Sequence, residues 1–129
     1  MTTISLSRPS ITDEEIKASE RVLRSGWLVY GPENRAFEEE LAAACGKRFC
    51  VTVSSGTAAL HLGLLAQKLP LTSILSPALT FPATANVANF LPTPPQVHLA
   101  DVDADTFCLR KETVQAWLDA RRGPALVVH

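Results

Sequence analysis

The stretch with the clearest chemistry is residues 51–64, VTVSSGTAALHLGL, where a β-branched run passes through two serines and a glycine into good helix formers. A strand followed at once by a helix leaves unpaired backbone amides at the positive end of the helix dipole. Such a turn is suited to an anion, and to phosphate in particular. Gly56 allows close backbone approach, and the hydroxyls of Ser55 and Thr57 add hydrogen-bonding groups.

The same turn has a second interpretation as a simple helix cap. Ser55 or Thr57 is a suitable N-cap for a buried helix that begins near Ala58. The residues alone do not decide between a phosphate site and a helix cap. The turn has neither the G-x-G-x-x-G spacing nor the lysine of a Walker loop, so it does not favour a dinucleotide or a nucleoside triphosphate.

Composition narrows the class of protein that carries this turn. The 129 residues are enough for one ordinary domain, and 47% of them are hydrophobic, which predicts a packed core. With 12 basic and 13 acidic side chains, the sequence lacks the charge excess of a nucleic-acid or anionic-membrane binder. No signal peptide or membrane-length apolar run is present, so a cytoplasmic location is expected. Three cysteines without paired spacing predict reduced thiols and no zinc site.

Two helices are expected before the turn. The segment TDEEIKASERVLRSG begins with a capping box formed by Thr12 and Glu15 and stops at Gly26. The segment GPENRAFEEELAAACG repeats this plan, with acidic residues near its start and Gly46 as its stop.

From Arg48 onward, short apolar runs alternate with helical segments. Strands are predicted at 49–53, 73–76, 96–100 and 125–128, with helices after Gly56 and Thr80 and at 111–122. Apolar strands joined by helices indicate an α/β fold with a mainly parallel sheet, flanked by helices and connected by right-handed crossovers. The sequence stops directly after the last strand, so we expect a single, incomplete domain over 1–129.

Three blocks of the sequence carry a resemblance to a known family. They are residues 25–66 (SGWLVYGPENRAFEEELAAACGKRFCVTVSSGTAALHLGLLA), SPALTFPATANVANF and DVDADTF, in that order. Together they resemble the N-terminal part of the DegT/DnrJ/StrS-type sugar aminotransferases, which are fold type I enzymes dependent on pyridoxal phosphate. The resemblance implies that 1–46 holds the N-terminal helices and a substrate-side segment, and that 47–129 begins the cofactor-binding large domain.

The resemblance also implies a cofactor site. It maps the phosphate cup to Gly56 and Thr57, with the backbone amide of Ala58 contributing, and so coincides with the turn in which Ser55 offers its hydroxyl. It gives Phe81 the role of the aromatic residue that stacks on the pyridine ring. The alternative for Phe81 is a core aromatic behind the sheet, although its place after a strand favours the ligand side.

The substrate side of the family corresponds to SGWLVYGP. Trp27, Tyr30 and Gly31 are therefore candidates for contact with a nucleotide-sugar. Equally open is that Trp27 packs under the first helix and that Tyr30 faces a partner subunit. His129 resembles a family histidine that follows a strand.

The reaction implied by the resemblance transfers an amino group, with glutamate as the expected donor, to a keto sugar attached to a nucleotide. A homodimer is also implied. In this family the Schiff-base lysine and the aspartate that pairs with the pyridine nitrogen follow the equivalent of His129, so no catalytic residue is assigned and the 129-residue chain is expected to be inactive alone. The alternatives are a non-catalytic remnant and a small phosphate-binding module.

Two further features are given no function. Asp101, Asp103, Asp105 and Glu112 have the spacing of an EF-hand loop, but Thr106 stands where the loop needs glycine, so we expect an ordinary solvated loop. His61 lies in a helix that is apolar nearly all round, which predicts a partly buried residue with a backbone or water partner.

Overall fold

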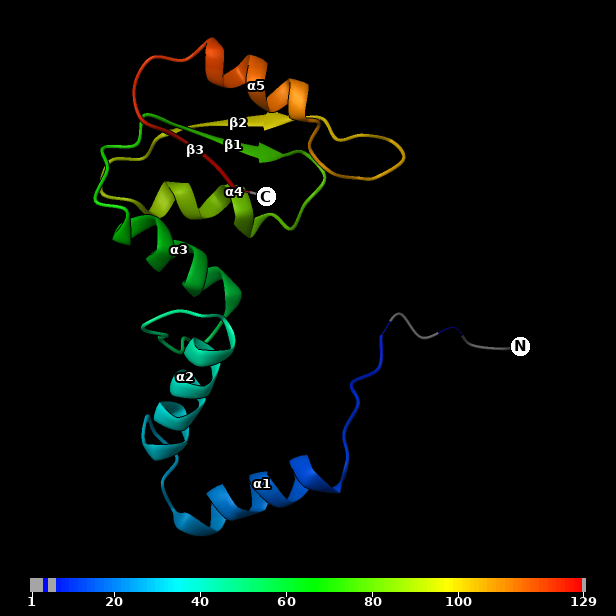
Figure 1. The fold of residues 1–129 in the computed structure, drawn as a ribbon, viewed down its shortest axis with the longest axis vertical. Helices are drawn as coiled ribbons and strands as arrows, with labels where there is room; N and C mark the ends of the chain where they lie inside the picture. The colour runs from blue at the N-terminus through cyan, green and yellow to red at the C-terminus, as the bar shows by residue number, and fades with distance from the viewer. Residues whose placement is uncertain (1–3, 5–6, 129) are drawn as a thin grey trace. The chain divides into compact units, whose positions relative to one another are not determined.

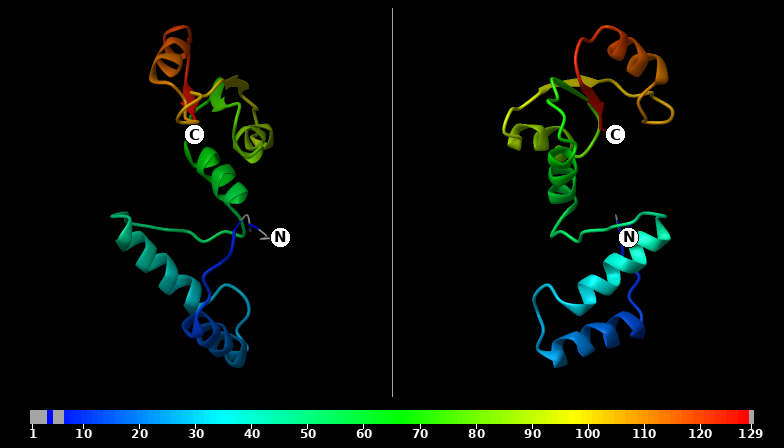
Figure 2. Two further views of the ribbon diagram at one scale, coloured as in Figure 1. Left: turned by 90° about the vertical axis from the view of Figure 1, so that its right-hand side faces the viewer. Right: turned by 60° about the vertical axis from the view of Figure 1, so that its left-hand side comes forward.

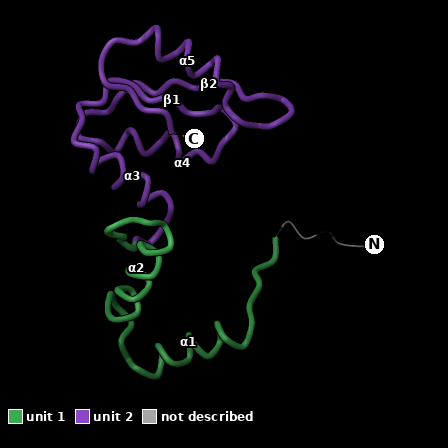
Figure 3. The backbone as a smooth tube through the Cα atoms, in the orientation of Figure 1, with its two compact units in different colours: residues 1–52 green, residues 53–129 purple. Residues whose placement is uncertain are grey.

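The computed structural model describes Ile4 and residues 7–128. By their contacts these residues fall into two compact units, 1–52 and 53–129 (Figure 3). Each unit is described by itself.

The first unit begins with helix α1 (Asp13–Ser25). The expected capping box is confirmed, because the amide of Thr12 donates to Glu15 Oε2 at 2.6 Å and the Thr12 hydroxyl accepts from the Glu14 amide. Gly26 ends the helix as predicted, in the left-handed conformation with φ 71°. That conformation is open to glycine without the Cβ penalty, which explains why the helix stops at this residue.

Helix α2 (Pro32–Ala44) follows after a short segment. Pro32 occupies its first turn, where the missing amide costs nothing, and Gly46 has φ 62° just past its end, as expected. Arg21 of α1 makes a two-pronged ion pair with Glu33 of α2, with Nη2 3.1 Å from Oε2. Both side chains are exposed, so this pair orients the helices and adds little stability.

The second unit contains a three-stranded parallel sheet in the order β2-β1-β3 (Figure 1). The strands are β1 (Ser73–Pro77), β2 (Gln96–Ala100) and β3 (Ala125–Val127). Every residue of the central strand is buried. The predicted α/β class and parallel sheet are therefore confirmed, and the apolar character of the central segment reflects burial on both faces.

The two faces of this sheet have different partners. Ile74 lies beside Val97 and Leu126 in the register, and these side chains pack against α3 (Gly56–Ala66) and η1 (Val87–Phe90). The short helix α4 (Ala83–Asn86) leads into η1 on this face. Helix α5 (Lys111–Asp119) covers the opposite face, where His98 of β2 meets Trp117 (Figures 1 and 2).

The strand predicted over 49–53 is wrong. Both edges of β1 are taken by β2 and β3, and 49–53 pairs with no strand among the described residues. The amide of Thr52 instead donates to the Glu38 carboxylate at 2.7 Å, and Phe49 and Val51 are 81% and 74% exposed. A β-branched run becomes a strand only where a partner receives its backbone hydrogen bonds, and the sequence pattern alone carries no information on that partner.

The acidic loop after β2 is a hydrogen-bonded turn. Asp103 Oδ1 accepts the amides of Asp105 and Thr106, each at 3.0 Å, and its Oδ2 accepts from Arg110 Nε at 3.0 Å. Donation from these amides lowers the pKa of Asp103, with the positive charge of Arg110 as a weaker cause. The side chain that organises the loop is therefore that of Asp103.

Candidate functional site

The N-terminus of α3 combines a cap with free backbone amides. Ser55 is the N-cap, and its hydroxyl accepts from the amide of Ala58 at 3.2 Å. No partner among the described residues takes the amides of Gly56 and Thr57. Capping and anion binding are thus compatible in this turn, because the cap uses the third amide of the helix and leaves the first two.

This hydrogen-bonding arrangement differs from the expected phosphate cup in one detail. Ala58 was expected to contribute its amide and Ser55 its hydroxyl, but these two groups are bonded to each other. The donors without a partner in the described structure belong to Gly56 and Thr57. Gly56 has open space where a Cβ would stand, with no atom within 4 Å of that position. The backbone of Gly56 is therefore open to close approach on the side where a Cβ would stand.

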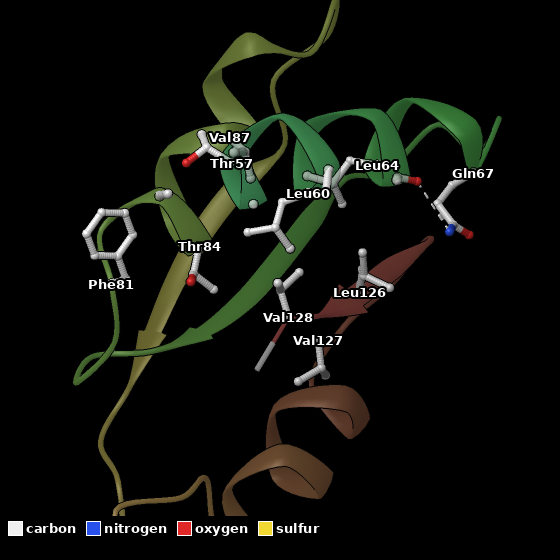
Figure 4. A pocket seen from close by; sticks show the side chains of 14 residues that line it. Thr57, Leu60, Leu64, Gln67, Phe81, Thr84, Val87, Leu126, Val127 and Val128 are labelled. Carbon is white, nitrogen blue, oxygen red and sulfur yellow. Dashed lines mark hydrogen bonds between the residues drawn. The ribbon is translucent and has the colours of Figure 1, made fainter. Parts of the chain in front are cut away.

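A cavity of about 800 Å³ opens beside this turn within the second unit (Figure 4). Its polar groups come from Thr57 at the start of α3, Thr84 of α4 and Gln67 at the end of α3. The rest of its wall is formed by apolar side chains, among them Leu60, Leu64, Leu126 and Val128. A cavity with apolar walls and a few polar groups is the usual form of a small-molecule site.

Phe81 lies at the same end of this cavity as Thr84 (Figure 4). It follows β1, beyond the carboxyl end of the central strand, and its side chain is 74% exposed. A core aromatic would be buried, so the alternative interpretation of Phe81 as a core residue is wrong. Its position matches the rule that ligands of open parallel sheets bind outside the carboxyl ends of the strands.

The segment between α1 and α2 forms a separate cavity of about 550 Å³ within the first unit. Trp27, Tyr30 and Gly31 line it together. The indole Nε1 of Trp27 donates to the carbonyl of Tyr30 at 3.1 Å. Gly31 is buried against the indole ring, and a Cβ on it would stand 2.1 Å from Nε1. Trp27 therefore packs back onto its own segment, with 57% of its side chain exposed, rather than under α1.

Comparison of the sequence with known protein families identifies the family of this chain. The sequence profile of the DegT/DnrJ/EryC1/StrS aminotransferase family matches residues 9–129. The chain belongs to this family.

Solved structures support the assignment of this chain to the DegT family. It is similar to the putative sugar aminotransferase Spr1654 from Streptococcus pneumoniae in its PMP-form, with 30% identity and a TM-score of 0.77 over 88% of this chain and 28% of that one. The PLP-form of the same protein gives 29% identity and 0.77, covering 89% and 29%. An aminotransferase from Brucella abortus shares the fold at 24% identity and 0.73, covering 89% and 32%. The chain thus spans less than a third of the length of these structures.

The DegT-family aminotransferases depend on pyridoxal phosphate. Of the residues expected to bind the cofactor, Gly56, Thr57 and Phe81 line one cavity of the second unit, whereas Ser55 and Ala58 do not line it. Thr84, from the same sequence block as Phe81, joins them and contacts Thr80, with the two hydroxyl oxygens 3.3 Å apart. Thr84 was quoted for the resemblance but not singled out as a site residue. Its backbone amide donates to the carbonyl of Phe81 at 3.0 Å, which keeps the two residues close.

The residue that sequence reasoning missed in this DegT-family chain is Glu38. Its carboxylate accepts from the Tyr30 hydroxyl at 2.7 Å and from both the amide and the hydroxyl of Thr52, at 2.7 and 2.8 Å. These bonds, led by the one from the Thr52 amide, lower the pKa of Glu38. The hydrogen bond between Tyr30 and Glu38 raises the pKa of Tyr30. Glu38 stands in a run of three glutamates, which carries no sign of which one faces inward.

Other candidate residues are placed as follows. His129 lies outside the described residues. His61 is half-buried as expected and meets the Phe90 ring edge-on at 5.8 Å, but its Nε2 has no protein partner in the described part of the chain. Cys45, Cys50 and Cys108 are free thiols. Over Ile4 and residues 7–128, no helix is long and apolar enough to cross a membrane, and no group of three metal-ligating side chains occurs.

Proposed function

We propose that this chain is the N-terminal part of a pyridoxal-phosphate-dependent sugar aminotransferase, in which the α3 turn holds the cofactor phosphate. The observation that carries the proposal is the meeting of three features in one cavity. These are the unpaired amides of Gly56 and Thr57, the Thr57 side chain, and the exposed ring of Phe81. Membership of the DegT family supplies the class of ligand.

The residues fit the cofactor group by group. A phosphate dianion is stabilised by two amides at the positive end of an eleven-residue helix and by a neighbouring hydroxyl. The space beside Gly56 that a Cβ would fill is open, so a phosphate oxygen could approach the backbone there. The flat face of Phe81 suits a pyridine ring, and Leu126 and Val127 of β3 add apolar surface to the same cavity.

When bound, pyridoxal phosphate supplies the electron sink through which an amino group moves from a donor to a ketone. The residues of this chain bind and orient. Gly56 and Thr57 anchor the phosphate, Phe81 fixes the plane of the ring, and Ser55 holds the helix end rigid by capping it. No residue of this chain is proposed to form the bond to the cofactor, and the lysine expected for that step belongs to the part of the family sequence beyond His129.

The substrate is proposed to be a keto sugar attached to a nucleotide, with glutamate as the amino donor. Trp27, Tyr30 and Gly31 form the substrate side, because they line one cavity with two exposed aromatic rings. Aromatic faces bind bases and sugar rings alike. The protein is further proposed to be a homodimer in the cytoplasm.

The test uses a cofactor analogue that does not react with lysine. Binding of 4-deoxypyridoxine 5′-phosphate, which lacks the aldehyde, is measured by equilibrium dialysis, with unphosphorylated 4-deoxypyridoxine as the comparison. The phosphorylated analogue should bind and inorganic phosphate should compete with it. Thr57→Ala should weaken binding by about tenfold or more, the loss of one hydrogen bond to a charged group, whereas Thr93→Ala, an exposed threonine elsewhere, should not.

Two results would count against the proposal. Equal binding of the two analogues would show that the turn does not hold the phosphate. Binding of inorganic phosphate that excludes neither analogue would favour the alternative, a phosphate-binding module without a cofactor.

A further inference from the structure

The substrate-side segment depends on a carboxylate that no ligand has to touch. Glu38 lies on α2, eight residues after Tyr30 and fourteen before Thr52. One oxygen accepts from Tyr30 and the other from the amide and hydroxyl of Thr52. The single side chain thus ties the segment before α2 to the segment after it.

The polar atoms of both aromatic residues are used inside the chain. The Trp27 indole N–H is bonded to the Tyr30 carbonyl, and the Tyr30 hydroxyl is bonded to Glu38. What the two residues still present outward is ring surface, since they are 57% and 55% exposed. A ligand in this cavity is therefore met by aromatic faces, whose direction is set by the hydrogen bonds behind them.

The contacts of these residues form a series that begins at Glu38. Glu38 fixes Tyr30 at its hydroxyl, the Tyr30 carbonyl fixes the Trp27 indole, and the indole packs on the buried Gly31. Glu38 is itself held from the other side by two bonds from Thr52, so it is not free to follow a movement of Tyr30. Loss of Glu38 would release the first contact of this series.

We infer that Glu38 is a positioning residue for the substrate side, whose carboxylate holds Tyr30, and through it Trp27, in the orientation that receives the base or sugar of a nucleotide-sugar. The inference rests on the proposed function for the nature of the ligand. It rests on the three hydrogen bonds of Glu38 for the role of this residue.

The first measurement follows the hydroxyl of Tyr30, the single tyrosine of the sequence. Its ionisation is read from absorbance near 295 nm, with helix content followed in parallel. The bond to ionised Glu38 raises the pKa of Tyr30, and the nearby Arg35 guanidinium opposes this more weakly. The tyrosine midpoint of Glu38→Gln and Glu38→Ala should therefore fall below that of the wild type. Glu40→Ala, at an exposed position of the same helix, should leave it unchanged.

The second measurement follows binding of uridine diphosphate and thymidine diphosphate by quenching of tryptophan fluorescence. Glu38→Ala and Tyr30→Phe should each weaken the better of the two probes by about tenfold, the size of one lost charge-assisted hydrogen bond. The double variant should bind no worse than either single variant, because both changes break the same contact. Because a general loss of structure would also make the losses non-additive, helix content is compared in all three variants and must stay that of the wild type.

The outcomes separate the inference from the proposed function. Unchanged nucleotide affinity in a folded Glu38→Ala chain, additive losses in the double variant, or a wild type that binds neither probe would each overturn the positioning role. Binding of deoxypyridoxine phosphate through Thr57 is decided independently, so a chain that passes that test and fails this one retains its cofactor site and loses only the role of Glu38. If Glu38→Ala does not fold, Glu38→Gln and Tyr30→Phe carry the comparison.

Discussion

Nδ1 of His98 on β2 lies 2.9 Å from Nη2 of Arg121, just past the end of α5. Because a guanidinium only donates, Nδ1 must accept, and the proton of the neutral ring is then on Nε2. The Arg121 guanidinium also lies over the Trp117 ring at 5.0 Å, and the His98 and Trp117 rings meet edge-on. These three residues join α5 to the sheet.

This relationship predicts that the docking of α5 weakens in acid. Burial, and secondarily the charge of Arg121, lowers the pKa of His98 below its ordinary value. The unfolded chain therefore binds the proton more readily than the folded chain. The stability that neutral His98 contributes is present above its ordinary pKa of about 6.5 and is lost as the pH falls below that value. Hydrogen exchange of the α5 amides, after correction for intrinsic rates, should show faster opening at pH 5.5 than at pH 7.5.

His98→Gln is the matched variant for this effect. Glutamine keeps an acceptor for Arg121 but does not titrate in this range, so the difference between the two pH values should shrink. An equal pH dependence in the variant would assign it to another group.

We expect Ser55 and Thr57, the two hydroxyl residues on either side of Gly56, to give different results when each is replaced by alanine. Ser55→Ala removes the helix cap and should lower the free energy of unfolding by about 1 kcal/mol. Thr57→Ala leaves that cap intact and should instead affect phosphate binding. Chemical denaturation and analogue binding, measured on both variants, should show opposite rankings. Equal losses of stability and of binding in the two variants would contradict this division.

The centre of the sheet predicts a large cost for a small change. Ile74 is completely buried between its two neighbouring strands and the helices that cover them. Ile74→Ala should destabilise the second unit by about 2–5 kcal/mol through lost burial and the cavity left behind. Leu99→Ala, at a side chain that is 64% exposed on β2, should stay within about 0.5 kcal/mol. Urea unfolding followed by circular dichroism measures both.

Two glycines predict opposite results for the same substitution. Gly31→Ala would place its methyl group inside the Trp27 ring, so the indole must turn away and its bond to the Tyr30 carbonyl is lost. Gly63→Ala meets no atom within 4 Å and should stabilise α3 by about 0.5–1 kcal/mol through helix propensity. The indole N–H resonance of Trp27 should move in the first variant and stay in the second. An unmoved indole in Gly31→Ala would contradict the packing described here.

Local signals predicted the elements that depend on local chemistry. The Thr12–Glu15 capping box and the stops at Gly26 and Gly46 involve residues within one turn of each other, and all three are confirmed. The central strand was equally clear, because a strand buried on both faces has no polar alternation.

The features that sequence reasoning missed depend on partners distant in the chain. Residues 49–53 have the composition of a strand, but the Thr52 amide bonds to Glu38 instead of a neighbouring strand. For the same reason Glu38 could not be distinguished from the glutamates beside it, since its role comes from Tyr30 and Thr52. The turn that leads into α3 was predicted in position, whereas the pairing of Ser55 with Ala58 that leaves two amides available required the structure.

The most direct test of the central claim follows individual backbone amides as the cofactor analogue binds. The chain, labelled with ¹⁵N, is titrated with 4-deoxypyridoxine 5′-phosphate, and the amide resonances of the α3 turn are recorded. Gly56 and Thr57 should shift together and saturate, more strongly than Ala58, whose amide is already bonded to Ser55. If these two resonances stay in place while the analogue binds, or move equally with unphosphorylated deoxypyridoxine, the α3 turn is not the phosphate site.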